Sequence, residues 1–163
     1  MNDVATRRED AEIPYADIHA TRRSDVEFGM KFSHSLVVAS KDIDEQGHVN
    51  NVVFLQWVQD VAVAHWLSLT NKEERERYSW VAVRHEIDYK KQAFENEEIT
   101  ATTWIGKWTA VTCERFTEIR RGDDLLVKGR TIWCMIDRVT TRPTRISSEL
   151  KLTWLTRSRK KER

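Results

Sequence analysis

The sequence predicts an α+β fold in which one antiparallel β-sheet wraps around a single long helix. Three observations support this prediction: the length of 163 residues fits one domain, residues 52–67 form an apolar stretch without Gly or Pro, and four strand-like segments follow that stretch. An apolar helix and an apolar sheet face bury each other, so a sheet around the helix satisfies this order of elements.

The central helix is predicted from length. Residues 52–67 are rich in β-branched side chains, and intrinsic propensity does not decide between helix and strand. Sixteen residues exceed a usual strand, so the segment is predicted to be helical, with Asn50 or Asn51 as its N-cap. Its only strongly polar members are Gln56, Gln59, Asp60 and His65. A helix that is apolar on nearly every side should be buried on nearly every side.

The other elements surround this helix in sequence. We expect a strand at 32–39, a polar loop at 41–50, and a short exposed helical turn at 71–78. The four later strands are predicted at Trp80–Lys90, Ile99–Trp108, Ala110–Arg120 and Leu125–Asp137. We expect hairpins to join them in succession, with turn residues at 121–124. A loop should follow at 138–143, with Pro143 outside the sheet, and then a short helix at 147–155.

Composition and charge set limits on function. The net charge is +1, so no global field argues for nucleic acid or a membrane surface. Cys113 and Cys134 lie in strand-like segments without CxxC spacing, which favours buried free thiols in a reducing compartment. We expect no signal peptide, since the N-terminal region is polar, and no stretch near the 18 apolar residues of a membrane span. The cytoplasm is therefore the expected location.

The chain is expected to have three parts. Residues 1–27 are polar and charged and are predicted to be a disordered or loosely held arm. Residues 28–155 form the single domain. Residues 156–163 are a basic tail, interpreted as a solvated end, with a phosphate or acidic-lipid contact as the alternative.

A carboxylate-bearing loop directly before the long helix has the groups that a thioester hydrolase needs. A carboxylate can activate water, and general-base help contributes about 10²–10⁴ in rate. The free N–H groups and positive dipole end of a helix N-terminus can stabilise an oxyanion. Asp44 lies seven residues before Asn51, where the helix should start, so the loop can fold this carboxylate back over the helix end.

The loop also resembles a known signature. The run Asp42-Ile-Asp-Glu-Gln-Gly-His-Val-Asn-Asn51, followed by an aromatic at Phe54 and a buried helix, resembles that of acyl-CoA thioesterases of the 4-hydroxybenzoyl-CoA thioesterase type. It is also similar to the motif of acyl-ACP thioesterases. The resemblance covers about residues 30–150 and includes the segment 137–146 after the last strand. It implies a hotdog fold, an antiparallel sheet of about five strands wrapped around one long buried helix.

The resemblance implies a role for each residue of the loop. Asp44 matches the catalytic carboxylate, acting as base or nucleophile, and the Asn51 N–H matches the group that polarises the carbonyl. Gly47 matches the small residue of the tight turn, and His48 and Asn50 match residues that orient the carboxylate, the water or the thioester. Structural alternatives remain open: an Asx turn at Asp44, helix capping by the asparagines, and a structural histidine.

Further residues are candidates of lower rank. Asp42 is a neighbouring carboxylate without the matching spacing. Asp60 is a second-rank catalytic candidate, because some hotdog enzymes carry their acid on this helix, with a structural role as the alternative. His65 is interpreted as a core or interface histidine. The candidates for substrate binding are Phe54, Trp57, Arg84, Lys90 and Lys91.

The expected activity is hydrolysis of acyl-CoA thioesters. An acyl-ACP thioesterase, a hotdog hydratase or dehydratase, and a non-catalytic acyl-CoA binding protein are the alternatives. No metal and no organic cofactor is indicated. Because a lone sheet leaves an open edge, we expect a homodimer or a dimer of dimers with the active site at the subunit interface.

Overall fold

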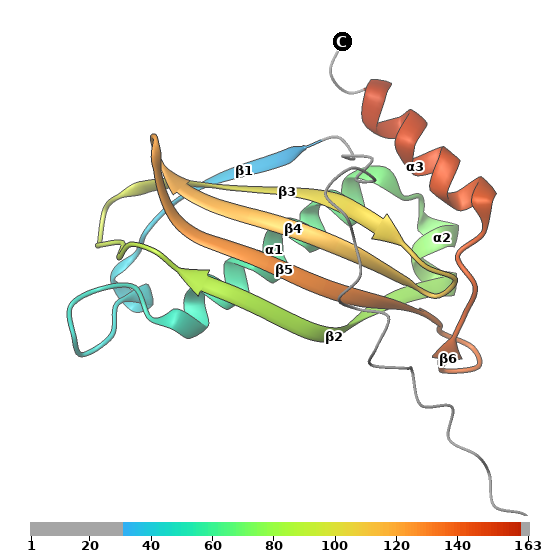
Figure 1. Ribbon diagram of the computed structural model, residues 1–163, viewed down its shortest axis with the longest axis horizontal. Coiled ribbons are helices and arrows are strands. Elements are labelled where there is room, and N and C mark those ends of the chain that lie inside the picture. The colour runs from blue at the N-terminus through green and yellow to red at the C-terminus, as the bar shows by residue number, and fades with distance from the viewer. Residues whose placement is uncertain (1–30, 161–163) are drawn as a thin grey trace, which may run out of the picture.

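An antiparallel sheet curls around one long helix, α1, in a computed structural model that describes residues 31–160, with side chains described to residue 154 (Figure 1). The predicted α+β architecture, with about five main strands, is confirmed. The elements are β1 Phe32–Val37, a 3₁₀ turn Ser40–Asp42, α1 Asn51–Leu69, α2 Lys72–Arg77, β2 Tyr78–Tyr89, β3 Glu98–Trp108, β4 Thr112–Arg121, β5 Asp124–Asp137, β6 Arg142–Pro143 and α3 Ser148–Lys160. The expected arm at 1–27 lies outside the described residues.

The helix α1 is close to its predicted bounds, and its ends have clear physical causes. Asn50 is the N-cap, with its side chain accepting a hydrogen bond from the Val52 N–H at 2.9 Å. At the other end, the Thr70 N–H donates to the Trp66 carbonyl, and Thr70 itself has extended backbone angles. Its buried residues recur at helical spacing and pack against the sheet: Phe54, Trp57, Val58, Val61, Ala62, His65 and Leu69.

The expectation that α1 is buried on nearly every side is wrong for this single chain. Val52 is 70% exposed, Val63 49% and Leu67 52%. The curled sheet covers only one side of the helix, which leaves these apolar side chains largely exposed in one chain. The helix also has the length and the mean hydropathy, 1.2, of one that could cross a membrane, contrary to expectation. Its packing against the sheet accounts for that composition, as in the core helix of a globular domain.

The strand order is β1-β3-β4-β5-β2, and β6 pairs with β5. The expectation that hairpins join the four later strands in succession is therefore wrong at one point: β2 pairs with β5 at one edge of the sheet, and the chain crosses over to β3 through residues 90–97. The predicted turn at 121–124 is confirmed as the β4–β5 hairpin, where Gly122 has a φ of +52°. Such a φ is readily adopted by glycine.

Two clusters of buried residues fill the space between α1 and the sheet. The first lies around Phe54 and Val58 of α1 and Ile119 of β4. The second is aromatic and joins Trp154 of α3 with partly buried tryptophans of α1, β2, β3 and β5. The predicted burial of Cys113 and Cys134 as free thiols is confirmed.

The C-terminal region differs from expectation in two respects. Pro143 was expected outside the sheet but lies in the two-residue strand β6, opposite Ile136 of β5. Proline is tolerated there because β6 is an edge strand. The last helix was expected at 147–155, and α3 continues to Lys160. It begins after Ser147, whose hydroxyl accepts a hydrogen bond from the Leu150 N–H at 3.0 Å.

Candidate active site

The loop before α1 is a tight, hydrogen-bonded turn. The Asp44 N–H donates to the His48 carbonyl at 2.9 Å, and the Gly47 N–H donates to the Asp44 carbonyl at 3.0 Å. Gly47 has a φ of +82°, in the left-handed region that favours glycine. Ile43 and Val49 form a β-bridge that closes the base of the turn. The structure thus brings Asp44 and His48 together, as the resemblance implied.

The Asp44 carboxylate is partly fixed by its own turn and partly open. Oδ1 accepts a hydrogen bond from the Gln46 N–H at 2.8 Å, which forms an Asx turn. Oδ2 lies 3.7 Å from His48 Nδ1, longer than a hydrogen bond but close enough for electrostatic attraction. The Asp44 and His48 side chains are 21% and 16% exposed. A carboxylate oriented in this way retains acceptor capacity for a water molecule.

The N-terminus of α1 lies directly after this turn. The Asn50 side chain accepts its hydrogen bond from the Val52 N–H and not from the Asn51 N–H. The Asn51 N–H therefore has no acceptor among the described residues. The helix end is braced from β2, where the Tyr89 hydroxyl donates to the Asn51 carbonyl at 3.2 Å. Helix capping by Asn50 is therefore confirmed, and an N–H donor is left at the start of α1, where a thioester carbonyl could accept from it.

Asp42 and Asp60 line a cavity beside β1, apart from Asp44. Asp42 Oδ2 accepts a hydrogen bond from the Ala39 N–H at 2.9 Å and so caps the 3₁₀ turn. Asp60 was expected within a buried helix, but it is exposed and accepts from Gln56 Nε2 at 2.8 Å. The prediction of burial fails because Asp60 lies on a side of α1 that the sheet does not cover. Both carboxylates line a cavity of about 340 Å³ beside β1, with Trp57 but without Asp44.

The predicted aromatic binding residues are largely core residues. Phe54 is 2% exposed and packs edge-to-face on Trp57, with ring centroids 5.3 Å apart. Trp57 is 7% exposed, and its remaining surface lines the cavity that contains Asp60. Phe54 also lies near Tyr89, 6.1 Å between centroids, so it supports the residue that braces the helix end. The prediction for His65 is confirmed as a core residue, at 4% exposure.

The predicted basic binding residues each have a carboxylate partner. Arg84 Nη2 lies 2.7 Å from Glu86, Lys90 Nζ lies 3.3 Å from Asp88, and Lys91 pairs with Asp124. The lysines follow Tyr89 at the end of β2 that reaches the start of α1. Arg84 lies six residues before Lys90, which corresponds to roughly 20 Å along an extended strand. One chain therefore does not bring the three cationic side chains to one point.

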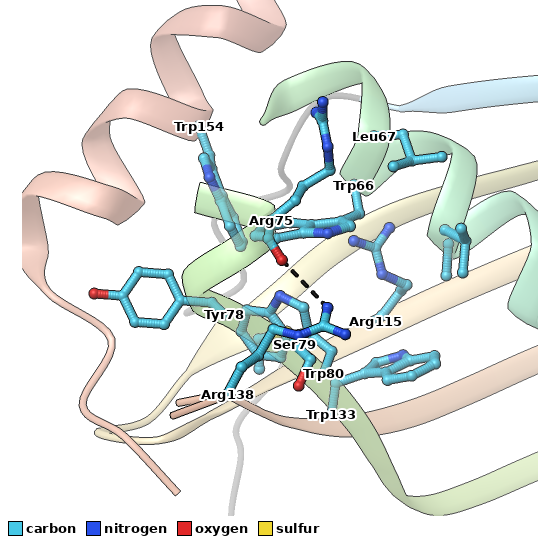
Figure 2. Close-up of a pocket in the computed structure, with 13 residues that line it drawn as sticks. Trp66, Leu67, Arg75, Tyr78, Ser79, Trp80, Arg115, Trp133, Arg138 and Trp154 are labelled. Atoms are coloured by element: carbon cyan, nitrogen blue, oxygen red, sulfur yellow. Dashed lines mark hydrogen bonds between the residues drawn. The ribbon is translucent and has the colours of Figure 1, made fainter. Parts of the chain in front are cut away.

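Two features have no counterpart in the sequence-based prediction. Tyr89 was not singled out, although its place at the end of a predicted strand and next to two lysines is visible in the sequence. A second cavity, of about 240 Å³, lies at the C-terminal end of α1 (Figure 2) and is lined by four tryptophans and three arginines. The only sequence signal for it is the number of tryptophans, seven. Among the side chains that the structure describes, no group of His, Cys, Asp or Glu is arranged to hold a metal ion.

Comparison with known proteins agrees with this architecture. The family model of the thioesterase-like superfamily matches residues 38–153. No curated protein matches the chain. A predicted thioesterase from Bacillus stearothermophilus is 21% identical, with a TM-score of 0.71, over 78% of this chain and 96% of that one.

Two further solved structures have the same fold. A 1,4-dihydroxy-2-naphthoyl-CoA thioesterase from Synechocystis is 17% identical, with a TM-score of 0.67, over 82% of this chain and 99% of that one. A hypothetical protein from Staphylococcus aureus, solved in complex with CoA, is 17% identical, with a TM-score of 0.70, over 80% and 85%. The family match spans most of the chain and includes the loop, α1 and every main strand after it. The chain therefore belongs to the thioesterase-like superfamily of thioester hydrolases and has the hotdog fold.

Proposed function

We propose that this protein hydrolyses acyl-CoA thioesters, with Asp44 as general base or nucleophile and the N-terminus of α1 as the oxyanion site. The observation that carries the proposal is the juxtaposition of a half-open carboxylate and a helix N-terminus within one short loop. Asp44 is held by the Gln46 N–H on one oxygen only, and the Asn51 N–H begins a helix of 19 residues.

In the base mechanism, Asp44 accepts a proton from a water molecule whose oxygen attacks the thioester carbonyl carbon. The carbonyl oxygen gains negative charge and accepts a hydrogen bond from the Asn51 N–H, in the positive end of the α1 dipole. The carbon–sulfur bond then breaks, the thiolate leaves, and the proton held by Asp44 neutralises it. We assign to His48 the role of orienting the Asp44 carboxylate, on the basis of their 3.7 Å separation.

In the nucleophile mechanism, Asp44 attacks the carbonyl and forms a mixed anhydride, which water then cleaves. The two mechanisms can differ in whether the oxygen atom of water is first incorporated into the acyl product or into the Asp44 carboxylate. Single turnover in ¹⁸O-labelled water places label in the acyl product under the base mechanism. Attack of water at the Asp44 carbonyl of an anhydride would place label in the enzyme, which mass spectrometry of peptides detects.

The choice of CoA over an acyl carrier protein rests on charge. An acidic carrier protein requires a patch of basic side chains around the site. Arg84, Lys90 and Lys91 are instead paired with carboxylates of this chain, which lowers the attraction they offer to a large acidic surface. Two solved structures of the same fold are named for CoA chemistry, one a CoA thioesterase and one a complex with CoA.

The test is a panel of acyl-CoA and acyl-ACP substrates assayed for free thiol. We expect turnover of acyl-CoA, and a fall in kcat of roughly 10²–10⁴ in Asp44→Asn. Asp42→Asn is the matched control, because Asp42 caps the 3₁₀ turn and its amide can still accept the Ala39 N–H; its kcat should stay close to that of the unmodified protein. Absence of thiol release from every substrate would refute the activity, and equal kcat in Asp44→Asn would refute the assignment of Asp44.

We propose further that the enzyme acts as a homodimer or a dimer of dimers in the cytoplasm. The open edge of β2 and the exposed apolar residues of α1 support the assembly. The two buried free thiols, Cys113 and Cys134, support a reducing compartment. Cell fractionation with an antibody against the protein tests the location, and recovery from an oxidising compartment would contradict it.

A further inference from the structure

The cavity at the C-terminal end of α1 is built from four elements that carry tryptophan. Trp66 of α1, Trp80 of β2, Trp133 of β5 and Trp154 of α3 all line it. Trp66 and Trp154 meet nearly edge-to-face, with ring centroids 4.9 Å apart, and Trp66 and Trp80 likewise at 6.2 Å. The walls are therefore flat aromatic surfaces set at angles to one another, which suit a flat apolar body.

The cavity also carries an unbalanced positive charge. Arg75, Arg115 and Arg138 line it, and no Asp or Glu does. The ion pairs that arginines make in the described part of the chain belong to Arg84, Arg120, Arg121 and Arg130. Arg138 donates to the Arg75 carbonyl, as the dashed line in Figure 2 marks, and Arg75 donates to the Thr70 carbonyl. Figure 2 shows the Arg75 side chain pointing away, so Arg75 presents its carbonyl to the cavity, and the guanidinium groups of Arg115 and Arg138 share it without a carboxylate.

Arg115 is the most buried of the three. It is 7% exposed, and its Nη1 donates to His65 Nδ1 at 3.0 Å and to Thr103 Oγ1 at 3.3 Å. Burial lowers the pKa of Arg115, but a guanidinium remains protonated in proteins. Its neighbours leave the charge uncompensated, and a buried cation without an anion is strongly disfavoured. Figure 2 shows its side chain between Trp66 and Trp133, facing the interior of the cavity.

Two tryptophans of the cavity wall also carry buried donors without a partner in the described part of the chain. The indole N–H groups of Trp133 and Trp154 are buried and have no hydrogen-bond partner among the described residues. A buried donor that lacks an acceptor destabilises the protein, so such groups are rare unless a ligand or water accepts from them. Both tryptophans line the cavity. The cavity therefore offers positive charge between aromatic walls, and what it lacks is an acceptor with negative charge.

We propose that this cavity binds an organic carboxylate with a flat aromatic body. The carboxylate accepts from the Arg115 guanidinium, which is matched to a planar two-oxygen anion, and the aromatic body lies against the tryptophan rings. Within one chain the site is separate from the Asp44 loop: Trp66 follows Asn51 by fifteen residues, roughly 22 Å along α1. The proposal concerns binding of a free acid and does not rest on thioester hydrolysis.

The test is isothermal titration calorimetry of the full chain with 3-phenylpropionate. The neutral alcohol 3-phenylpropan-1-ol has the same ring and chain length without the charge. We expect saturable binding of the acid, weaker by roughly tenfold or more for the alcohol, since charge-assisted hydrogen bonds are lost. Because four of the seven tryptophans line the cavity, binding should also change the intrinsic fluorescence. No binding of the acid, or equal binding of the alcohol, would overturn the proposal.

Variants locate the binding. Arg115→Gln should weaken it roughly tenfold to 100-fold, with circular dichroism to verify folding, because Arg115 is buried. Arg138→Gln, at an exposed arginine of the lining, should weaken it less, and Arg142→Gln, at an exposed arginine outside the lining, should not change it. Asp44→Asn should bind the acid like the unmodified protein, which separates this result from the catalytic one. Equal weakening by Arg138→Gln and Arg142→Gln would overturn the location.

Discussion

The turn that carries Asp44 depends on one backbone conformation. Gly47 has a φ of +82°, and a Cβ added there would meet no atom within 4 Å. The cost of a side chain at this position is therefore backbone strain alone, about 1–2 kcal/mol. Gly122, with a φ of +52° and equally open surroundings, is in the same situation in the β4–β5 turn. The two glycines form a matched pair, one next to the proposed base and one far from it in sequence.

We predict that Gly47→Ala and Gly122→Ala each lower the free energy of unfolding by about 1 kcal/mol. Only Gly47→Ala should also lower kcat for thioester hydrolysis, because the strain shifts the turn that holds Asp44. Urea denaturation gives the stabilities and the thiol-release assay gives the rates. A loss of kcat in both variants would mean that lowered stability, rather than the Asp44 turn, controls the rate.

The two cysteines should be inert in the native protein. Burial raises the pKa of Cys113 to about 12 and also raises the pKa of Cys134. At pH 8 a raised pKa leaves less thiolate, which is the reactive form, and both side chains are almost inaccessible. We predict no rapid labelling by a thiol reagent at pH 8, and two labelled thiols after unfolding in guanidinium, counted by mass spectrometry. Rapid native labelling would show that β4 and β5 open under assay conditions.

At the level of elements, an asparagine side chain caps both α1 and α2, but only the cap of α1 is expected to affect catalysis. Asn50 caps α1, and Asn71 caps α2, where its side chain accepts from the Glu74 N–H at 2.8 Å. Each cap satisfies an N–H that has no partner within its helix, and its loss typically costs about 1 kcal/mol. Because α1 begins at the proposed oxyanion site, its cap also fixes the direction of the donors in that site.

We predict that Asn50→Ala and Asn71→Ala reduce stability similarly, by about 1 kcal/mol each. Asn50→Ala should in addition reduce kcat, whereas Asn71→Ala should not. Asn50→Ser keeps a capping oxygen and should restore both stability and kcat. Failure of the serine variant to restore kcat would assign to Asn50 a role beyond capping.

The contrast between Asp44 and Asp60 shows what the sequence can and cannot predict about the site. Asp44, Gly47 and His48 are neighbours in the chain, and local turn chemistry brings them together, so their grouping was predictable. Whether Asp60 is buried depends on how far the sheet curls around α1, which no local pattern determines. The second cavity is harder still to predict, because Arg115 and its tryptophan neighbours come from elements far apart in sequence.

The same division applies to the fold. The bounds of α1 were predictable because length and an N-cap are local features, and the β4–β5 hairpin was predictable from Gly122 and its neighbours. The pairing of β2 with β5 was not, because strand order depends on contacts between distant segments. The hydrophobic period identifies a strand, but it does not say which other strand it pairs with.

At the level of the whole molecule, one edge of the sheet is suited to a partner. β2 pairs with β5 on one side and with no other strand in residues 31–160 on the other, and its Val81 and Val83 are 50% and 52% exposed. β1, the opposite edge, is half as long and carries Ser and His. A long edge strand with an exposed apolar half is a template for pairing with another chain, so β2 rather than β1 is the expected dimer edge.

We predict that the unmodified protein is at least dimeric at micromolar concentration by light scattering, and that Val83→Lys yields monomers, because a charged residue on an edge strand opposes pairing. Val139→Lys is the control: Val139 is 86% exposed in the turn after β5, so its replacement should leave the assembly unchanged. If the active site is shared between subunits, the monomeric variant should also lose kcat, although Asp44 and the start of α1 are untouched. A fully active monomer would show instead that the Asp44 loop and the N-terminus of α1 suffice within one chain.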